Sequence, residues 1–430
     1  MLDKLFKLTA NGTDIKTEVI AGVTTFLTMA YIIVVNPGML SAAGMDYGAV
    51  FTATCIAAAI GSLIMGLLAN YPIALAPGMG VNAFFAFVVV NQMGHSWQVA
   101  LAAVFFSGLI FLLLSLFKVR EWIVNSIPKT LRFGISAGIG FFLALIALKN
   151  VGIIVDSPAT LVSMGNLLAP ASLLTAFGFF LICALAYRKV TGAVMIGIVL
   201  TTVAAMLLGL TEFKGFMAAP PSLAPTFMAM DLAAVLDVSL IGIVFTFLFV
   251  DLFDTSGTLI AAAHRGNLLD KQGRLPRLKR ALMADSIATM SGAVLGTSTT
   301  TSYIESTAGI SAGGRTGLTA VVVAILFLLS LFFAPLAAIV PACATAPALL
   351  YVAVLMSGGL SYIEWDDITE AAPGVITALM MAFTFSIANG IAAGFISYAA
   401  IKLLSGKFKD LNASVLVIAG LFVVKIIWIG

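Results

Sequence analysis

The stretch YPIALAPGMGVNAFFAFVVV, residues 71–90, has the features of a membrane helix that is broken in its middle. Pro72, Pro77, Gly78 and Gly80 precede an apolar run that is shorter than the roughly 20 residues a membrane-spanning helix needs. Proline removes a helical hydrogen bond and glycine weakens a helix, so the backbone in front of this run is not expected to be helical. Non-helical backbone at membrane depth is tolerated only where it lines a cavity or is buried in protein.

A second interrupted segment, GTSTTTSYIESTAGISAGG at residues 296–314, occupies a matching place in the second half of the chain. It has a Ser/Thr tract followed by only a short apolar piece around Glu305. Each interrupted segment begins roughly 55–60 residues after a long apolar span opens, and the second of these spans contains Asp251. Paired broken segments in two halves indicate an inverted-repeat transporter whose substrate binds near the middle of the bilayer.

The composition of the chain excludes a water-soluble globule. Of 430 residues, 61% are hydrophobic and only 10% are charged, whereas soluble domains carry about 25% charged residues. Apolar runs long enough to cross a bilayer recur from Ile20 to Ile429 and lack the short alternating pattern of a β-barrel. Residues 1–19 are polar and charged, so no cleavable signal peptide is expected. Three cysteines in separate apolar runs have no metal-ligand spacing and are expected to be free thiols.

Basic residues cluster in alternate loops between the apolar runs, which indicates the orientation in the membrane. The positive-inside rule places these loops and the N-terminus in the cytoplasm, in a multi-pass protein of the inner (cytoplasmic) membrane. Because the charges flank membrane spans and carry no interleaved aromatic residues, a nucleic-acid surface is disfavoured. The basic residues of these loops are Lys4, Lys7, Lys16, Lys118, Arg120, Lys129, Arg132, Arg188, Lys189, Arg265, Lys271, Arg274, Arg277, Lys279, Arg280, Arg315, Lys402, Lys407 and Lys409.

Two aspartates, Asp251 and Asp254, lie inside an apolar run, where a charged side chain costs a few kcal/mol or more. On a helix they form one polar stripe with Thr255 and Thr258, at spacings of three, four and seven residues. One interpretation is a buried ion pair that holds helices together. The other is a polar face directed at a binding cavity, which the scarcity of basic residues inside the spans favours.

Two residues of the interrupted segments have a structural and a functional interpretation. Ser302 to Glu305 fits the capping-box pattern, in which the glutamate folds back on its own helix start, but the carboxylate at this depth also suits a cavity. Asn82 could cap the helix that follows Gly80 or offer both a donor and an acceptor to a ligand. The sequence shows no nucleophile–base pair, phosphate loop or metal-ligand cluster, so we expect neither an enzyme nor a bound cofactor or metal.

The chain resembles the AzgA-like purine permeases, a branch of the nucleobase–ascorbate transporter superfamily. Four long motifs carry the resemblance in the same order, and it extends over nearly the whole chain. The motifs are AGVTTFLTMAYIIVVNPGML at 21–40, residues 71–90 quoted above, FVDLFDTSGTLI at 249–260 and GTSTTTSYIESTAGISAGGRTGLTAVV at 296–322.

The resemblance implies an all-α polytopic membrane fold of about fourteen transmembrane segments in two inverted repeats of seven, as in uracil transporters. The third and tenth segments are then broken and carry short strands. The implied division is a core domain from residues 1–120 and 231–336, a gate domain from 121–230 and 337–410, and an extra apolar segment at 411–430. Uracil transporters lack that last segment, which could span the membrane, lie in its interface or pack along the helix bundle.

The resemblance also implies the site residues. Asp254 and Glu305 are expected to hold the base, and Asp251 and Glu305 are the candidates for proton coupling, with Asp251 alternatively positioning the core. Thr258 stands where uracil transporters have a histidine, so their proton relay does not transfer. The residues expected to complete the binding shell are Asn82, Thr301 and Ser302.

The implied function is proton-coupled import of purine nucleobases, with hypoxanthine and guanine favoured and adenine as a further candidate. The expected partners are the base, protons and the lipid bilayer, without nucleic acid, and a homodimer is compatible with the sequence. The alternatives are a transporter of the same architecture for xanthine, uracil or an anion, and, less favoured, a channel.

Overall fold

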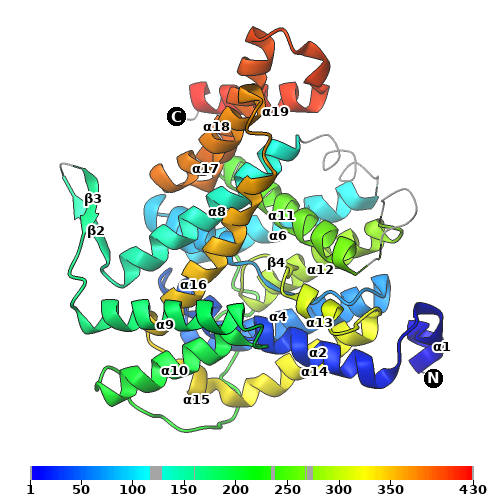
Figure 1. Ribbon diagram of the computed structural model, residues 1–430, viewed down its shortest axis with the longest axis vertical. Coiled ribbons are helices and arrows are strands. Elements are labelled where there is room, and N and C mark those ends of the chain that lie inside the picture. The colour runs from blue at the N-terminus through cyan, green and yellow to red at the C-terminus, as the bar shows by residue number, and fades with distance from the viewer. Residues whose placement is uncertain are drawn as a thin grey trace.

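A computed structural model describes residues 2–116, 128–158, 160–233, 238–266, 268 and 275–428. The described residues are mostly helical (Figure 1). In the first half the elements are α1 (Leu2–Phe6), α2 (Ile15–Met29), α3 (Ile32–Ser41), α4 (Tyr47–Ile64), β1 (Leu75–Pro77), α5 (Met79–Ala83), α6 (Trp97–Leu116), α8 (Lys129–Asn150), β2 (Ile154–Ser157), β3 (Leu161–Met164), α9 (Pro170–Tyr187) and α10 (Ala193–Leu207).

The second half begins with the longest helix, α11 (Val238–Arg265), which carries both aspartates of the polar stripe. The remaining elements are α12 (Leu278–Leu295), β4 (Thr300–Ser302), α13 (Ser306–Ser311), α14 (Gly317–Ser330), α15 (Ala334–Ala338), α16 (Ala342–Ser357), α17 (Ile368–Phe383), α18 (Ile387–Leu404) and α19 (Ala413–Trp428).

Polar side chains start several of these helices. Asp14 accepts a hydrogen bond from the backbone N–H of Thr17 at the start of α2. At the start of α4, Asp46 accepts one from the backbone N–H of Ala49. Thr316 and Ser386 cap α14 and α18 in the same way. Each cap satisfies a backbone donor that the helix leaves unpaired, which matters more in a bilayer because no water replaces it.

Eight of the described helical stretches are long and apolar enough to cross a membrane, and five shorter apolar helices accompany them. This confirms the prediction of an all-α multi-pass membrane protein, while the count of about fourteen segments stays a prediction. The eight stretches are Ile15–Ser41, Tyr47–Ala69, Trp97–Leu116, Lys129–Asn150, Pro170–Tyr187, Gly317–Ala338, Ala342–Tyr362 and Ile387–Leu404.

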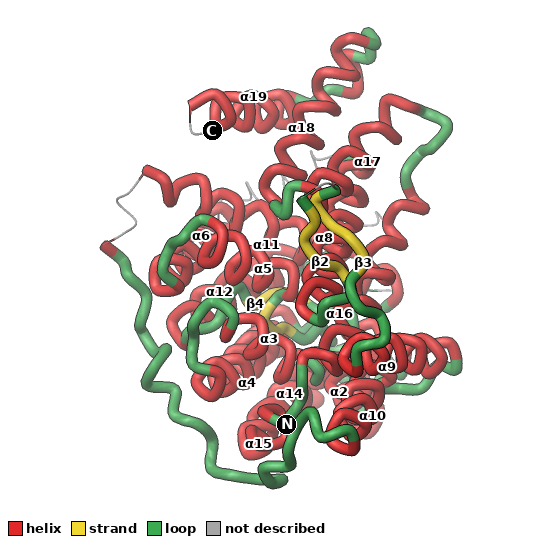
Figure 2. The backbone as a smooth tube through the Cα atoms, turned by 90° about the vertical axis from the view of Figure 1, so that its left-hand side faces the viewer, coloured by secondary structure: helices red, strands yellow, loops and turns green. Residues whose placement is uncertain are grey.

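The two interrupted segments carry short strands that pair with each other, as the resemblance implied. β1 and β4 are antiparallel, with Leu75 opposite Ser302 and Pro77 opposite Thr300. α2 begins at Ile15 and β1 60 residues later, while α11 begins at Val238 and β4 62 residues later. Antiparallel pairing at matched offsets is the geometry of two inverted repeats, and β4 lies near the middle of the molecule in both views (Figures 1 and 2).

The helices pack in two groups. In one, α14 lies against α2 and α4, while α12 lies against α4 and α6, and α11 against α6. In the other, α8 packs against α16 and α17, α17 against α18, and α9 against α10 and α16. The strand pair and α11 belong to the first group. Whether the groups move as separate core and gate domains stays a prediction.

A buried glutamate ties α2 to the start of α14. Glu18 is 0% exposed, and its carboxylate accepts hydrogen bonds from the backbone N–H groups of Arg315, Thr316 and Thr319. The hydroxyl of Thr319 donates to it as well, at 2.6 Å. Because a carboxylate at a helix N-terminus pairs with orphan N–H groups and the helix dipole, this buried charge is fully accounted for.

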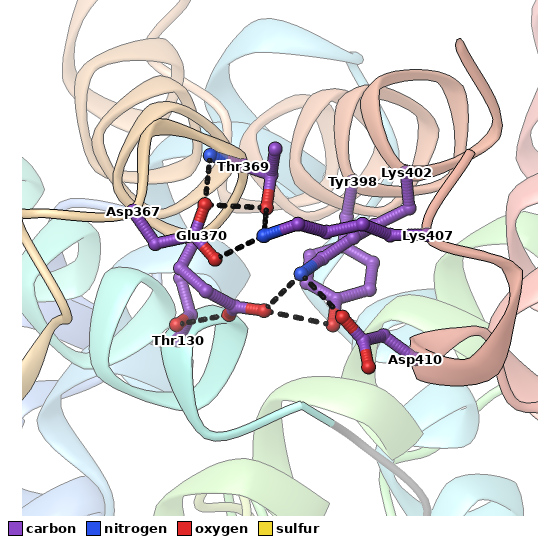
Figure 3. Close-up of polar contacts among 8 residues, drawn as sticks. All are labelled: Thr130, Asp367, Thr369, Glu370, Tyr398, Lys402, Lys407 and Asp410. Carbon is purple, nitrogen blue, oxygen red and sulfur yellow. Dashed lines mark hydrogen bonds and ion pairs between the residues drawn. The ribbon is translucent and has the colours of Figure 1, made fainter. Parts of the chain in front are cut away.

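A second set of charges, the Lys402 cluster, gathers around a buried lysine and joins α8, α17 and α18 (Figure 3). The ammonium of Lys402, a residue only 1% exposed, lies 2.6 Å from a carboxylate oxygen of Glu370 and 3.1 Å from one of Asp410. Thr130 and Tyr398 donate hydrogen bonds to the two oxygens of Glu370, at 2.6 and 3.2 Å. Each charge in this cluster therefore has an opposite charge or a donor beside it.

The extra C-terminal segment forms α19, which packs against α18 and crosses it in Figure 2. The ring of Phe422 contacts Phe245 and Phe249 of α11 and Phe395 of α18. A cavity of about 540 Å³ with almost wholly apolar walls lies between α6, α11 and α19. The extra C-terminal segment therefore packs against the helix bundle.

Candidate functional site

The site expected from the sequence gathers around the β1–β4 pair. The pairing continues beyond the strands, because the backbone N–H of Gly78 donates to Thr299 at 2.9 Å and that of Tyr303 donates to Ala74 at 3.0 Å. The hydroxyl of Tyr303 also donates to the backbone oxygen of Pro77. The two backbone hydrogen bonds hold the starts of α5 and α13 next to each other at the centre of the fold.

Asp254 of α11 faces this strand pair. The hydroxyl of Thr301 lies 3.5 Å from the Asp254 Oδ2 atom, and the Asp254 side chain is only partly buried. Gly78 makes room for the contact, because a Cβ atom there would lie 2.9 Å from the Thr301 hydroxyl and 3.3 Å from Asp254 Oδ2. A side chain larger than hydrogen at position 78 would therefore press on Thr301 and Asp254.

Glu305 stands immediately before α13, and its carboxylate does not cap that helix. Its Oε1 atom instead accepts a hydrogen bond of 2.5 Å from the hydroxyl of Tyr31. The capping-box interpretation of Ser302 to Glu305 is therefore wrong, because Ser302 belongs to strand β4 and the helix begins only after Glu305. The Glu305 side chain is partly exposed, so the carboxyl has access to a space outside its own helix.

Asn82 lies inside α5, so the interpretation of it as an N-cap is also wrong; Gly78 holds that position. The side chain is 0% exposed, and its amide donates to Asn36 Oδ1 at 2.5 Å. The hydroxyl of Ser298 donates to the amide oxygen of Asn82. In this conformation the amide of Asn82 therefore connects α5 to α3 and to the Ser/Thr tract, and its role as a substrate ligand stays a prediction.

Neighbouring residues of β4 point to opposite faces, since side chains alternate along a strand. Thr301 faces Gly78 and Asp254, whereas Thr300 faces α4 and α12, where Gly61 and Gly292 make room for it. Ser302 shares the face of Thr300 by this alternation, away from Asp254. Its participation in the binding shell is therefore less favoured than that of Thr301.

The polar stripe of α11 contacts two neighbouring elements. Asp254 contacts the β1–β4 pair, and Thr255 contacts α12. Asp251 and Thr255 are both 0% exposed, and the Thr255 hydroxyl donates to Asp285 of α12 at 2.7 Å. Thr258 is 7% exposed. Asp254 is the most exposed of the four, which makes it the stripe's best candidate for contact with a ligand.

The charge of the site is uncompensated among the described residues. No Lys, Arg or His nitrogen of the described part of the chain lies within 4.0 Å of the Asp254 or Glu305 carboxylate. Within the same residues no three His, Cys, Asp or Glu side chains gather as metal ligands. The arrangement offers hydrogen-bond acceptors, one hydroxyl and the starts of two short helices, which suits a planar polar ligand that carries N–H donors.

A family model described as "Permease family" matches residues 16–393. The chain belongs to this permease family. Membership confirms the resemblance that the four sequence motifs carried, and it makes the chain a transport protein rather than an enzyme.

Individual permeases are similar over nearly the full length. The chain is 52% identical to the adenine permease AdeP of Escherichia coli (strain K12), covering 100% of this chain and 96% of that protein. It is 48% identical to the guanine/hypoxanthine permease PbuG of Bacillus subtilis (strain 168), covering 98% of each.

Solved structures share the fold at low sequence identity. The transmembrane domain of the cyanobacterial bicarbonate transporter BicA superposes with a TM-score of 0.68 at 18% identity, covering 88% of this permease and 96% of that domain. Murine Slc26a9, an anion transporter in an inward-facing state, superposes with a TM-score of 0.66 at 13% identity. The match covers 92% of this permease and 69% of that chain. These similarities establish the architecture of the permease and say nothing of its substrate.

Two residues that contact the site were not predicted from the sequence, namely Tyr31 and Asn36. Tyr31 stands in an apolar run where a tyrosine is unremarkable, so only the fold reveals that it meets Glu305. Asn36 carried a usable signal, because an amide inside a membrane span needs a partner. It donates to Thr54 and Thr297 at 2.7 and 2.9 Å.

Proposed function

We propose that this permease imports purine nucleobases by proton symport. The observation that carries the proposal is the pair of carboxyl groups, Asp254 and Glu305, at the meeting point of the two broken segments without a basic partner among the described residues. A carboxylate left without a counter-ion in a membrane protein needs a ligand or a proton. Relatives named for adenine and for guanine/hypoxanthine support a purine as that ligand.

The two carboxyl groups suit the hydrogen-bonding edges of purines. Guanine presents two adjacent N–H donors, which match the two oxygens of one ionised carboxylate. Hypoxanthine and adenine each present one donor beside one acceptor, which matches a protonated carboxyl. We favour hypoxanthine and guanine, with adenine as the further candidate, and assign the base to Asp254 and Glu305, with Thr301 beside them.

Proton coupling follows from the same groups. A proton that is taken up with the base neutralises a carboxylate of the protein. Without that proton, the carboxylate would move through the membrane as an uncompensated charge. Glu305 is the first candidate because its carboxyl is reachable from outside its helix, and Asp251 is the second. Asn82 is assigned to the binding shell through the network that it forms with Asn36 and Ser298.

Transport is proposed to proceed by movement of a core domain (1–120 and 231–336) against a gate domain (121–230 and 337–410). The two packing groups of helices support this division. The N-terminus is assigned to the cytoplasmic side of the inner membrane, because the described basic residues at helix ends, such as Lys16, Arg188 and Lys409, are exposed. Lys118, Arg120, Lys271 and Arg274, which belong to the same argument, lie outside the described residues.

The rival function is anion transport, because solved anion transporters share the fold. An anion site at the broken segments would use helix N-termini or a basic side chain. Here two carboxyl groups occupy that place, which would repel an anion, so the purine is favoured.

The test is uptake of labelled hypoxanthine by cells that express Glu305→Gln or Asp254→Asn at the level of the wild type. Each variant is expected to lose uptake by about 100-fold or more, since an amide resembles the protonated carboxyl but can neither ionise nor exchange the proton that symport requires. Asp156→Asn, which alters an exposed carboxylate on strand β2, is the matched control and should transport normally. Near wild-type uptake by both site variants would reject the site assignment.

The same assay decides the substrate and the coupling. Competition by unlabelled adenine, guanine, xanthine and uracil ranks the bases, and dissipating the proton gradient should abolish accumulation. Non-saturable flux would indicate a channel.

A further inference from the structure

Tyr31 lies at the junction where α2 ends and α3 begins, directly beside Glu305. Its side chain is 0% exposed, and its hydroxyl donates a 2.5 Å hydrogen bond to the Glu305 Oε1 atom. A buried tyrosine hydroxyl needs a partner, and in this fold the partner is the carboxyl that the proposed function assigns to the substrate.

The contact between α2 and the Glu305 segment is built into the packing. A Cβ atom on Gly309 of α13 would lie 2.1 Å from the Thr25 hydroxyl and 2.4 Å from the backbone oxygen of Ala21, so the two helices approach as closely as glycine allows. At the other end of α2, Glu18 binds the start of α14. The Tyr31 hydroxyl is thereby held in a fixed place relative to Glu305.

We propose that Tyr31 is a positioning residue for transport: its hydroxyl holds one oxygen of Glu305 and leaves the other to bind the base and carry the proton. This inference rests on the proposed function. It assigns to the junction of α2 and α3 a part in substrate binding that its apolar sequence does not suggest.

The hydrogen-bond chemistry gives the two oxygens different tasks. While the Tyr31 O–H donates to Oε1, that oxygen is occupied as an acceptor, and a proton on the carboxyl is carried by Oε2. Protonated Glu305 therefore donates from Oε2, and ionised Glu305 accepts there. Tyr31 donates in both states, so the carboxyl keeps its orientation while the proton binds and leaves.

The titratable groups that face Glu305 come from several elements. They are Tyr31, Tyr303 two residues before Glu305 in the chain, Asp254 on α11 and Tyr351 on α16. No basic nitrogen of the described residues lies within 4.0 Å of the carboxylate. Tyr303 is buried as Tyr31 is, but its hydroxyl donates to the backbone oxygen of Pro77. Removing that hydroxyl therefore provides a matched control.

The experiment compares Tyr31→Phe with Tyr303→Phe in labelled hypoxanthine uptake, measured against concentration and against pH from about 5 to 8. Tyr31→Phe is expected to raise KM about tenfold, because the carboxyl loses its orienting hydrogen bond. The position of the alkaline limb of the pH profile should also shift by about one pH unit, because the carboxyl loses the hydroxyl that contacts it in both protonation states. Tyr303→Phe should leave the limb at the wild-type position. Unchanged or equally shifted profiles in the two variants would overturn the proposal.

A substrate-free measurement separates this inference from the proposed function. The infrared carbonyl band of protonated Glu305, identified by its loss in Glu305→Gln, is titrated in the purified protein. The band's frequency and titration midpoint should change in Tyr31→Phe and stay in place in Tyr303→Phe. If the band responds to Tyr31→Phe while the wild type takes up no purine, the proposed function fails and only the orientation of Glu305 by Tyr31 is upheld. If the band does not respond to Tyr31→Phe, the positioning role fails whatever the substrate.

Discussion

The Lys402 cluster and the Asp254–Glu305 site both place carboxyl groups within the helix bundle, but only the cluster neutralises them. Glu370 and Asp410 lie 2.6 and 3.1 Å from the buried ammonium of Lys402. Asp254 and Glu305 have hydroxyl partners, and no basic nitrogen of the described residues lies within ion-pair distance.

The difference separates charges that hold helices together from charges that we propose bind a ligand. Removing one partner of a buried ion pair leaves an uncompensated charge and destabilises the fold strongly. When a carboxyl that already lacks a counter-ion is neutralised, the protein should lose little stability. The neutralised side chain should, however, no longer bind the proposed ligand. The comparison therefore predicts opposite effects of substitution on stability and on uptake at the two places.

The largest loss of stability is expected for Lys402→Met. It would leave Glu370 and Asp410 without their buried cation, and the free energy of unfolding should fall by about 3–5 kcal/mol. Thermal unfolding in detergent measures this loss, with Lys402→Arg as the variant expected to restore most of it.

The matched control is Lys149→Met, which removes an exposed ion pair to Asp156. It should change the unfolding free energy by no more than about 1 kcal/mol. Equal losses in Lys402→Met and Lys149→Met would show that the cluster does not hold α8, α17 and α18 together.

Glu305→Gln should lie at the opposite end of the comparison. The glutamine oxygen can still accept the Tyr31 hydrogen bond, and neutralising a carboxyl without a counter-ion removes a destabilising charge. We expect the unfolding free energy to change by less than about 1 kcal/mol although uptake is lost. A loss as large as that of Lys402→Met would make Glu305 a structural residue and would break the comparison.

Much of the fold was predictable because the spans of a membrane protein appear in its sequence as long apolar runs. The apolar runs predicted an all-α membrane protein, and the resemblance, carried by four motifs that include residues 71–90 and 296–322, predicted the strands β1 and β4. The first prediction follows from local composition, which the bilayer constrains strongly, whereas the strands were expected from the resemblance alone.

Partners distant in sequence could not be predicted in the same way. The carboxylate of Glu305 was expected to turn back on its own helix or to face a cavity, and neither expectation named Tyr31, which is 274 residues away. The Lys402 cluster was not predicted, because in the sequence Lys402 looks like any other basic residue at the end of a membrane helix. Its burial arises only from the packing of α17 against α18.

The smallest effect, and the one most sensitive to pH, is expected for the partly exposed pair of Asp367 and Lys407, next to the Lys402 cluster (Figure 3). A hydrogen bond from Lys407, followed by those from Thr369, holds the pKa of Asp367 well below its usual range. A carboxyl whose pKa is lower in the folded state contributes stability above its unfolded pKa of about 3.9 and loses it as the pH falls through the folded value. Lys407→Met should therefore lower the thermal midpoint slightly at neutral pH, and the gap to the wild type should close below about pH 4. A gap that stayed constant with pH would mean that Lys407 acts through packing of its aliphatic chain, and the contrast between paired and unpaired carboxylates would then rest on the buried charges alone.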